Sequence, residues 1–308
     1  MKVFILGATG SIGLPVACAL SRAGHEVYGL TRTKERAKQL AAEEINPIIG
    51  DSENREAWIG LISEVDVVIE SLGGTTDDSV MGPAVFNAVS AAAKQRPAGM
   101  PKLTYIYTSG AWTHGDDRKN VVTDTTPITN PVRLVKWRPA HEQAVLNDPV
   151  LNSIIIRPAF LYGGDASLLA PLFESASEGK VKWYDTPGGR FSVIHCEDLA
   201  DLYVRVAEKA QLLGGMVFDA ATNQTESVDD FLQKLVEVSG AQGPYEYMKP
   251  SNLFEEALAS TVMVRPYLAR SLLNWEPRMP GFVDGLPRWY SAWQASGKGA
   301  GHWSKHLA

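Results

Sequence analysis

The chain has 308 residues, a net charge of −6 at pH 7 and two cysteines. This length suffices for one large α/β unit or for a nucleotide-binding domain with a smaller partner, and it buries enough surface to fold without disulfides. Because the sequence has no long basic run, no apolar run of about 18 residues and no room for a cleavable leader, we expect no nucleic-acid partner, no membrane span and a cytoplasmic location.

The first expected element is a short apolar strand over residues 3–6, which runs into three glycines and a helix over about residues 11–23. Gly7 allows the sharp exit from the strand, Gly10 has no side chain to hold a pyrophosphate away from the backbone, and Gly13 lets the helix pack on the sheet. At a strand-to-helix junction this GxxGxxG spacing predicts a dinucleotide-binding turn, with the helix amides and dipole facing the phosphates.

A second strand is expected over residues 26–30, and it leads into Thr31 and Arg32 without a carboxylate. In NAD-binding units an acidic residue at this point holds the ribose hydroxyls. A guanidinium can instead chelate a 2′-phosphate through two hydrogen bonds. The sequence therefore favours NADP(H) over NAD(H), with Arg32 as the selecting residue. The alternative is that Arg32 is an ordinary surface residue.

Strand-like and helix-like segments continue to alternate along the chain. Further strands are expected over residues 47–49, 65–70, 102–108, 153–157 and 216–218, and helices over 34–44, 53–62, 80–94, 139–146, 198–210 and 229–239. Near-continuous apolar strands between helices predict a parallel sheet covered on both faces, and right-handed crossovers make it doubly wound. We therefore expect an α/β fold: a Rossmann-type doubly wound parallel sheet with a smaller C-terminal substrate lobe.

Glycine, proline and aromatic residues cluster over residues 162–191, which suggests where the lobe begins. We expect an NAD(P)-binding domain over residues 1–165, a mainly substrate-binding lobe over 166–295 with residues 190–220 returning in part to the sheet, and a flexible tail over 296–308. The tryptophans and tyrosines beyond residue 160 either line an apolar pocket or form core. Ligands of such sheets lie beyond the carboxyl ends of the strands, which here carry Gly7, Thr31, Asp51, Ser71 and Ser109.

Five segments occur in a familiar order: GATGSIG at 7–13, Gly50-Asp51, YIYTSG at 105–110, RPAFLYG at 157–163 and FSVIHCEDLA at 191–200. Together they resemble an extended or atypical short-chain dehydrogenase/reductase of the NAD-dependent epimerase/dehydratase family, over about residues 3–220. The resemblance implies that Asp51 holds the adenine amino group and that Pro158 lies in a turn beside the nicotinamide. The cofactor-binding residues expected from the motif and the resemblance are Gly7, Thr9, Gly10, Ser11, Ile12, Gly13, Thr31, Arg32, Asp51, Ser71, Leu72, Gly73, Thr108, His141 and Pro158.

The family's chemistry rests on a Tyr-x-x-x-Lys pair, in which the tyrosine moves a proton at the substrate oxygen and the lysine holds the ribose. Here the best alignment places Trp137 at the tyrosine position and His141 at the lysine position. The resemblance then implies that His141 holds the ribose and that Ser109 orients the substrate oxygen, unless Ser109 only satisfies backbone groups. Loss of a positioned general acid lowers a rate by about 10²- to 10⁴-fold and does not abolish hydride transfer.

Three readings of the altered pair stay open. In the first, another group supplies the proton; the candidates are His114, Tyr162, Tyr184 and His141, and a histidine titrates near neutrality. For His114 the alternative is an exposed loop histidine. In the second, the substrate needs little acid catalysis, as with an iminium or an activated double bond. In the third, the protein has kept the nucleotide site and lost the reaction.

We therefore expect an NADP(H)-dependent oxidoreductase that acts on a small organic carbonyl, imine or activated alkene. The alternatives are a non-catalytic NADP(H)-binding sensor and a redox-neutral isomerase or lyase on the same fold. No group of residues has metal-ligand spacing, and no GxSxG elbow supports a hydrolase. The expected partner is a small-molecule substrate, and the resemblance adds a homodimer formed through helices that flank the sheet.

Overall fold

A computed structural model describes residues 1–73, 78–164, 167–184 and 187–297. The chain divides into two compact units. Unit 1 comprises residues 1–109, 137–156 and 199–218, and unit 2 comprises residues 110–136, 157–198 and 219–308. The chain thus passes between the units several times, whereas the sequence analysis places one main boundary at residue 165.

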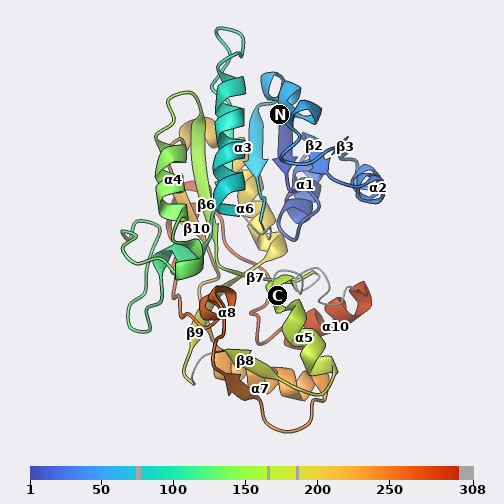
Figure 1. Ribbon diagram of the computed structural model, residues 1–308, viewed down its shortest axis with the longest axis vertical. Helices are drawn as coiled ribbons and strands as arrows, with labels where there is room; N and C mark the ends of the chain where they lie inside the picture. The colour runs from blue at the N-terminus through green and yellow to red at the C-terminus, as the bar shows by residue number, and fades with distance from the viewer. Residues whose placement is uncertain (74–77, 165–166, 185–186, 298–308) are drawn as a thin grey trace. The chain divides into compact units, whose positions relative to one another are not determined.

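Unit 1 is built on a parallel sheet that has, within the described residues, seven strands in the order β10-β6-β5-β4-β1-β2-β3 (Figure 1). The strand order runs one way from β1 to β3 and the other way from β4 to β10. The predicted doubly wound Rossmann-type fold is therefore confirmed, with the change of direction between β1 and β4. The strands are β1 (Lys2–Leu6), β2 (Glu26–Thr31), β3 (Asn46–Ile49), β4 (Val67–Glu70), β5 (Thr104–Thr108), β6 (Asn152–Pro158) and β10 (Val217–Ala220).

Helices cover both faces of this sheet. They are α1 (Gly13–Arg22), α2 (Lys34–Ala42), α3 (Asp78–Ala93), α4 (Arg138–Leu146) and α6 (Cys196–Glu208). The first three residues of α6 belong to unit 2. Successive strand residues point to opposite faces. Tyr105 packs in one apolar cluster with Phe86 of α3, whereas Thr108 bonds to Tyr203 of α6. Helices α3 and α6 therefore lie on opposite faces of β5.

Unit 2 contains smaller sheets and a core rich in aromatic rings. Its strands are β7 (Phe160–Tyr162), β8 (Lys182–Tyr184), β9 (Arg190–His195), β11 (Thr225–Ser227) and β12 (Glu246–Met248), and its helices are α5 (Ala170–Ser177), α7 (Val228–Ser239), α8 (Leu253–Leu258), α9 (Leu268–Leu273) and α10 (Leu286–Ser296). Trp183, Phe231, Phe282 and Trp289 share one buried cluster. The aromatic side chains of this segment are thus largely core, which was one of the two alternatives.

The helix expected over residues 53–62 is wrong. Two short 3-10 helices, η1 (Arg55–Ala57) and η2 (Ile59–Ser63), take its place. Asp51 turns the chain just before η1, because its Oδ1 atom accepts the backbone N–H groups of Glu53 and Asn54 at 2.9 and 2.6 Å. Trp58 turns inward, is 1% exposed and donates its indole N–H to the Asp51 carbonyl. Capping and inward packing of one large ring thus replace a regular helix.

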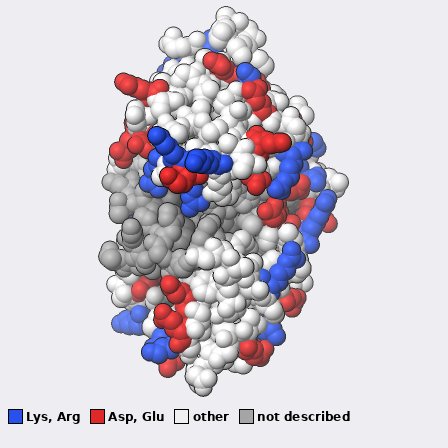
Figure 2. Space-filling model, turned by 90° about the vertical axis from the view of Figure 1, so that its right-hand side faces the viewer, with Lys and Arg blue, Asp and Glu red and all other residues white. Residues whose placement is uncertain are grey.

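Surface charge, helix length and the cysteines can each be compared with the sequence-based expectations. On the face drawn in Figure 2, acidic and basic side chains are interspersed, unlike the single-sign stripe of many nucleic-acid-binding proteins. Within the described ranges, no helix is both long and apolar enough to span a membrane. Cys18 and Cys196 are buried and are not joined in a disulfide. The expected tail lies outside the described residues from 298 onward.

Candidate nucleotide-binding and active site

The turn after β1 is closed around its glycines. Gly7 has φ +84°, a conformation that residues with a Cβ rarely adopt, and the Gly10 N–H donates to its carbonyl at 3.0 Å. A Cβ atom on Gly13 would lie 2.1 Å from that same carbonyl oxygen. The backbone therefore curls tightly, and side chains at Gly7 or Gly13 are excluded. This is the bare main-chain cradle that the motif predicts.

Ser71 braces this cradle from the end of β4. Its hydroxyl and its backbone N–H both donate to the Leu6 carbonyl at 2.9 Å. A Cβ on Gly7 would lie 2.6 Å from the Ser71 carbonyl oxygen, so the two strand ends touch. Helix α1 then begins with neither a side-chain cap nor an acidic residue in its first turn, which leaves its positive end for an anion.

The other strand ends of unit 1 carry residues of contrasting exposure. Thr31 is 3% exposed, and its Oγ1 atom has no hydrogen-bond partner among the described residues. Arg32, the next residue, is exposed, and Thr33 caps α2 by accepting the Arg36 N–H. Asp51 is exposed, with its Oδ1 atom engaged in the local turn. Of the remaining expected cofactor residues, Gly10 and Gly73 are exposed, Pro158 is buried, and Thr9, Ser11, Ile12 and Leu72 are half-buried.

The two hydroxyl residues that end β5 differ in their contacts. The Thr108 Oγ1 atom lies 2.6 Å from the hydroxyl of Tyr203, a fully buried residue of α6 that the sequence analysis missed. The Ser109 N–H donates to the Ile156 carbonyl at 2.8 Å. The Ser109 Oγ atom, however, is buried without a partner in the described part of the chain. Thr108 is therefore committed to packing of α6, and Ser109 keeps an uncommitted hydroxyl.

Trp137 and His141 lie at the start of α4, where Trp137 precedes the first helical turn. The His141 ring is 6% exposed and packs edge-on against Tyr107 and Phe86, with centroids 4.8 and 5.7 Å apart. Burial, with the nearby Arg138 charge, lowers the pKa of His141 to about 4. This pKa lies below the near-neutral value that the sequence analysis expects of a histidine. His141 is thus neutral at pH 7 and lacks the charge that a lysine would bring.

Glu70, at the end of β4, is a buried carboxyl group that the sequence analysis did not single out. It is 2% exposed and accepts a hydrogen bond from the Tyr105 hydroxyl. Burial raises its pKa to about 7. A Cβ on Gly82 of α3 would lie 3.7 Å from Glu70 Oε1 and 3.8 Å from His141 Nε2, so both atoms face the same point of α3. The available signal was an acidic residue at the end of a strand expected to be buried on both faces.

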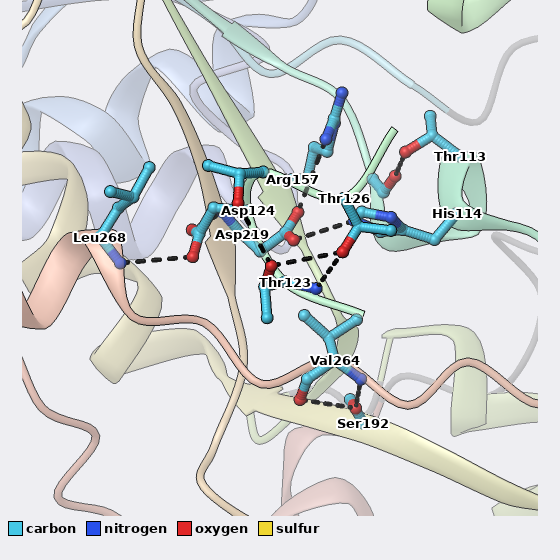
Figure 3. Close-up of polar contacts among 12 residues, drawn as sticks. Thr113, His114, Thr123, Asp124, Thr126, Arg157, Ser192, Asp219, Val264 and Leu268 are labelled. Atoms are coloured by element: carbon cyan, nitrogen blue, oxygen red, sulfur yellow. Dashed lines mark hydrogen bonds and ion pairs between the residues drawn. The ribbon is translucent and has the colours of Figure 1, made fainter. Parts of the chain in front are cut away.

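In unit 2, His114 is part of a buried polar cluster (Figure 3). Its Nε2 atom donates to Asp219 Oδ2 at 2.9 Å, and the two side chains are 1% and 0% exposed. Arg157 Nη1 lies 4.0 Å from the other oxygen of Asp219. The interpretation of His114 as an exposed loop histidine is therefore wrong. The residue lies in the 3-10 helix η3 (Ala111–His114), and its Nδ1 atom has no partner among the described residues.

Asp124 ties the same cluster to the rest of unit 2. One of its oxygens accepts the Asp219 N–H at 2.8 Å, and the other accepts the Tyr267 and Leu268 N–H groups at 2.8 and 3.3 Å (Figure 3). Each partner lies more than ninety residues away along the chain. Such side-chain bonds to distant backbone groups are not visible in local sequence patterns, so Asp124 could not be found from the sequence.

The tyrosines proposed as alternative proton donors are held in unit 2. Tyr162 is 0% exposed, and its hydroxyl donates to the Pro280 carbonyl at 2.7 Å. Burial raises the pKa of Tyr162 and of Tyr184 above the ordinary value of 10.0. A committed hydroxyl with a raised pKa is a poor proton donor at neutral pH, which disfavours Tyr162 in this role. No cluster of three metal-ligand side chains occurs among the residues described.

These features define an α/β protein of the Rossmann class with a tight glycine-rich turn after its first strand. The NAD(P)H-binding family model matches residues 7–210, and the chain belongs to that family as an extended short-chain dehydrogenase/reductase of the epimerase/dehydratase kind.

Named relatives cover most of the chain. A 4-hydroxy-2-methyl-3-oxo-4-farnesyl-3,4-dihydroquinoline-1-oxide ketoreductase of Stigmatella aurantiaca is 26% identical over 253 residues, which are 78% of this chain and 74% of the relative. A UDP-glucose 4-epimerase of Neisseria meningitidis serogroup C is 25% identical over 94% of this chain and 97% of its own length. The NAD complex of a dTDP-glucose 4,6-dehydratase from Bacillus anthracis has the same fold, with a TM-score of 0.81, 15% identity and coverage of 96% of this chain and 97% of that one.

Proposed function

We propose that this protein is an NADP(H)-dependent oxidoreductase that acts on a small organic carbonyl, imine or activated alkene. The observation that carries the proposal is a set of buried, unpartnered polar atoms at expected site residues of unit 1. Within the described residues, Thr31 Oγ1, Ser109 Oγ and His141 Nε2 all lack hydrogen-bond partners. An unmet buried polar group costs about 1–3 kcal/mol, so unmet groups at these three expected site residues favour a polar ligand that completes their bonds.

The glycine cradle fits the diphosphate of such a ligand. Its backbone is free of side chains where a phosphate must approach, and the uncapped start of α1 favours negative charge. Arg32 supports the choice of NADP(H), because it is an exposed guanidinium at the end of β2 and no carboxylate there would repel a 2′-phosphate. Asp51 keeps one carboxylate oxygen outside its local turn, which is compatible with a bond to the adenine amino group.

When bound, the nicotinamide of the cofactor supplies or accepts the hydride. The hydroxyl of Ser109 donates a hydrogen bond to the substrate oxygen and so holds the carbonyl in place. His141, neutral in its aromatic surroundings, contributes one hydrogen bond to the ribose and no charge. Trp137 has no ionisable group, so proton delivery falls to His114, to water or to the substrate itself.

The neutral state of His141 also favours a second candidate, an NADP(H)-binding sensor without turnover. Neither Trp137 nor an uncharged His141 reproduces the acid and the cation of the family's catalytic pair. The two functions differ in one simple readout. The purified protein is mixed with NADPH and a panel of ketones, imines and enones, and the loss of NADPH absorbance is followed. Turnover with any member supports the oxidoreductase, whereas saturable NADPH binding without turnover across the panel contradicts it and supports the sensor.

A further inference from the structure

Arg138, the first residue of α4, places a guanidinium group at the end of β5. Its Nη1 atom donates to the carbonyl of Thr108 at 3.3 Å, and the residue after Thr108 is Ser109. Consecutive Cα atoms lie about 3.8 Å apart. The positive charge of Arg138 thus contacts the backbone directly before the uncommitted Ser109 hydroxyl, at the carboxyl edge of the sheet where ligands of this fold lie. All three residues belong to unit 1.

Most of the donor groups of this guanidinium are uncommitted. Within the described residues it makes one hydrogen bond, through Nη1, and its Nε atom is buried without a partner. The Cζ atom lies over the Trp137 ring, 5.2 Å from its centroid, and this cation–π contact helps to hold the group in place. The Nε and Nη2 atoms form the side-on edge of the fork, and that edge matches the two oxygens of a carboxylate.

The titratable neighbours of Arg138 leave this edge open. Burial raises the pKa of Glu70 and Tyr107 and lowers that of His141, and the Arg138 charge acts on all three groups. Tyr107 and His141 are therefore neutral at pH 7, whereas Glu70, with a pKa of about 7, is partly ionised. A second carboxyl group, Glu142, lies one turn further along α4 and acts on the same two rings. Neither carboxyl group accepts a hydrogen bond from Nε, which has no partner in the described part of the chain.

We infer that the side-on edge of Arg138 binds a carboxylate of the substrate while Ser109 holds its ketone oxygen, so that the substrates are short oxo acids. This inference rests on the proposed function, because it names the substrate class of that reaction. A guanidinium only donates hydrogen bonds, so its partner must bring acceptors, and an anion gains from the charge as well. The two protein groups lie about one peptide unit apart. That spacing suits 2-oxo and 3-oxo acids, in which at most one carbon separates the ketone from the carboxylate.

The test compares two oxo acids with their uncharged amides. Pyruvate is paired with pyruvamide and acetoacetate with acetoacetamide, so that an NH₂ group replaces one carboxylate oxygen in each pair. Binding to the full chain is measured by ligand-observed NMR with NADP⁺ present, so that no reduction takes place. We expect the acid of at least one pair to bind about 10-fold or more tightly than its amide. Equal affinities within both pairs, or a preference for the amides, overturn the inference.

Substitutions at Arg138 are read by the same ratio of affinities. Arg138→Gln removes the charge and should reduce the preference for the acid to about 2-fold or less. Arg138→Lys keeps the charge but not the planar fork, and it should leave an intermediate preference. A merely structural role of Arg138 would weaken acid and amide alike, so an unchanged ratio in either folded variant contradicts the inference. Arg138→Lys therefore provides the test if Arg138→Gln fails to fold.

Lys136→Gln is the matched control, since it removes one positive charge at an exposed position two residues earlier. It should keep the full preference for the acid. An equal loss of preference in this control and in Arg138→Gln would trace the effect to overall charge and overturn the assignment to Arg138.

The same compounds separate this inference from the proposed function. A preference for the acid in binding, without NADPH oxidation by any ketone, leaves the carboxylate site standing and defeats the oxidoreductase. Oxidation of NADPH at equal kcat/KM with acid and amide does the reverse.

Discussion

His114 and Asp219 form a buried pair in which the histidine Nε2 atom lies 2.9 Å from a carboxylate oxygen, although 105 residues separate them along the chain. The side chains are 1% and 0% exposed. Because a carboxylate only accepts hydrogen bonds, Nε2 is the donor in this bond, and Nδ1 has no hydrogen-bond partner within the described part of the chain. The pair joins η3 to the end of β10 within unit 2.

Removal of one member of this pair should be costly. Asp219→Ala strands the His114 N–H in the interior, and we expect the free energy of unfolding to fall by about 1–3 kcal/mol. Urea titration followed by circular dichroism measures this change. The matched control is Glu256→Gln, which breaks the pair with Arg133, where the side chains are 72% and 40% exposed; its effect should stay below about 1 kcal/mol. Equal effects of the two substitutions would show that the buried pair is not stabilising.

Glu70 should make stability depend on pH. Burial raises its pKa from 4.5 to about 7 in the folded protein, so the protonated form stabilises the fold fully below pH 4.5. This stabilisation is lost as the pH rises toward 7, and it amounts to about 3 kcal/mol. Glu70→Gln should remove that dependence and unfold at higher urea concentration than the wild type at about pH 8.

The control for this prediction is Glu64→Gln, which changes an exposed carboxylate of the same unit. It should keep the wild-type pH profile. Parallel pH profiles for the wild type and Glu70→Gln would mean that Glu70 is ionised in the folded protein, in contradiction to its burial beside Tyr105.

The glycine cradle should be intolerant of a single methyl group. In Gly13→Ala the added Cβ meets the Gly7 carbonyl oxygen at 2.1 Å, so the turn must open and NADPH binding should be lost. Gly60→Ala is the matched control, since a Cβ there has no atom within 4 Å. Quenching or enhancement of NADPH fluorescence on titration measures both. Wild-type affinity in Gly13→Ala would remove the cradle from the cofactor site.

Thr108 and Tyr203 should behave as a coupled pair. Thr108→Val leaves the fully buried Tyr203 hydroxyl without its partner and should cost about 1–3 kcal/mol of stability. Tyr203→Phe in the same background should recover part of that loss, because no hydroxyl is then left unsatisfied. A double-mutant cycle in urea measures the coupling, and additive losses would contradict the bond.

Local patterns carried much of the fold and of the nucleotide cradle. Gly7, Gly10 and Gly13 are close in the chain, and the physical need for each is visible in their spacing, so the strand, turn and helix follow directly. The alternation of apolar strands and helices likewise yields the doubly wound sheet. The role of Arg32 stays a prediction, which rests on the absence of an acidic residue at the end of the second strand.

Long-range contacts account for what the sequence analysis missed. The environment of His114 depends on Asp219 and Arg157. That of Thr108 depends on Tyr203 of α6, which lies 95 residues further along the chain. The neutral state of His141 follows from rings contributed by β5 and α3. Residues 53–62 were mistaken for a helix because the Asp51 cap and the inward turn of Trp58 are tertiary features.

The most direct test of the account is a calorimetric titration of NADPH and NADH into the wild type, Arg32→Ala and Arg22→Ala, an exposed control with the same change of charge. We predict saturable NADPH binding to the wild type, tighter than that of NADH. Arg32→Ala should weaken NADPH by about 10-fold or more and leave NADH nearly unchanged, because one charge-assisted bidentate contact is lost. The control should bind both as the wild type does. If neither dinucleotide bound the wild type, the nucleotide site would be contradicted. Equal weakening of both by Arg32→Ala would contradict the role of Arg32 in selecting the 2′-phosphate.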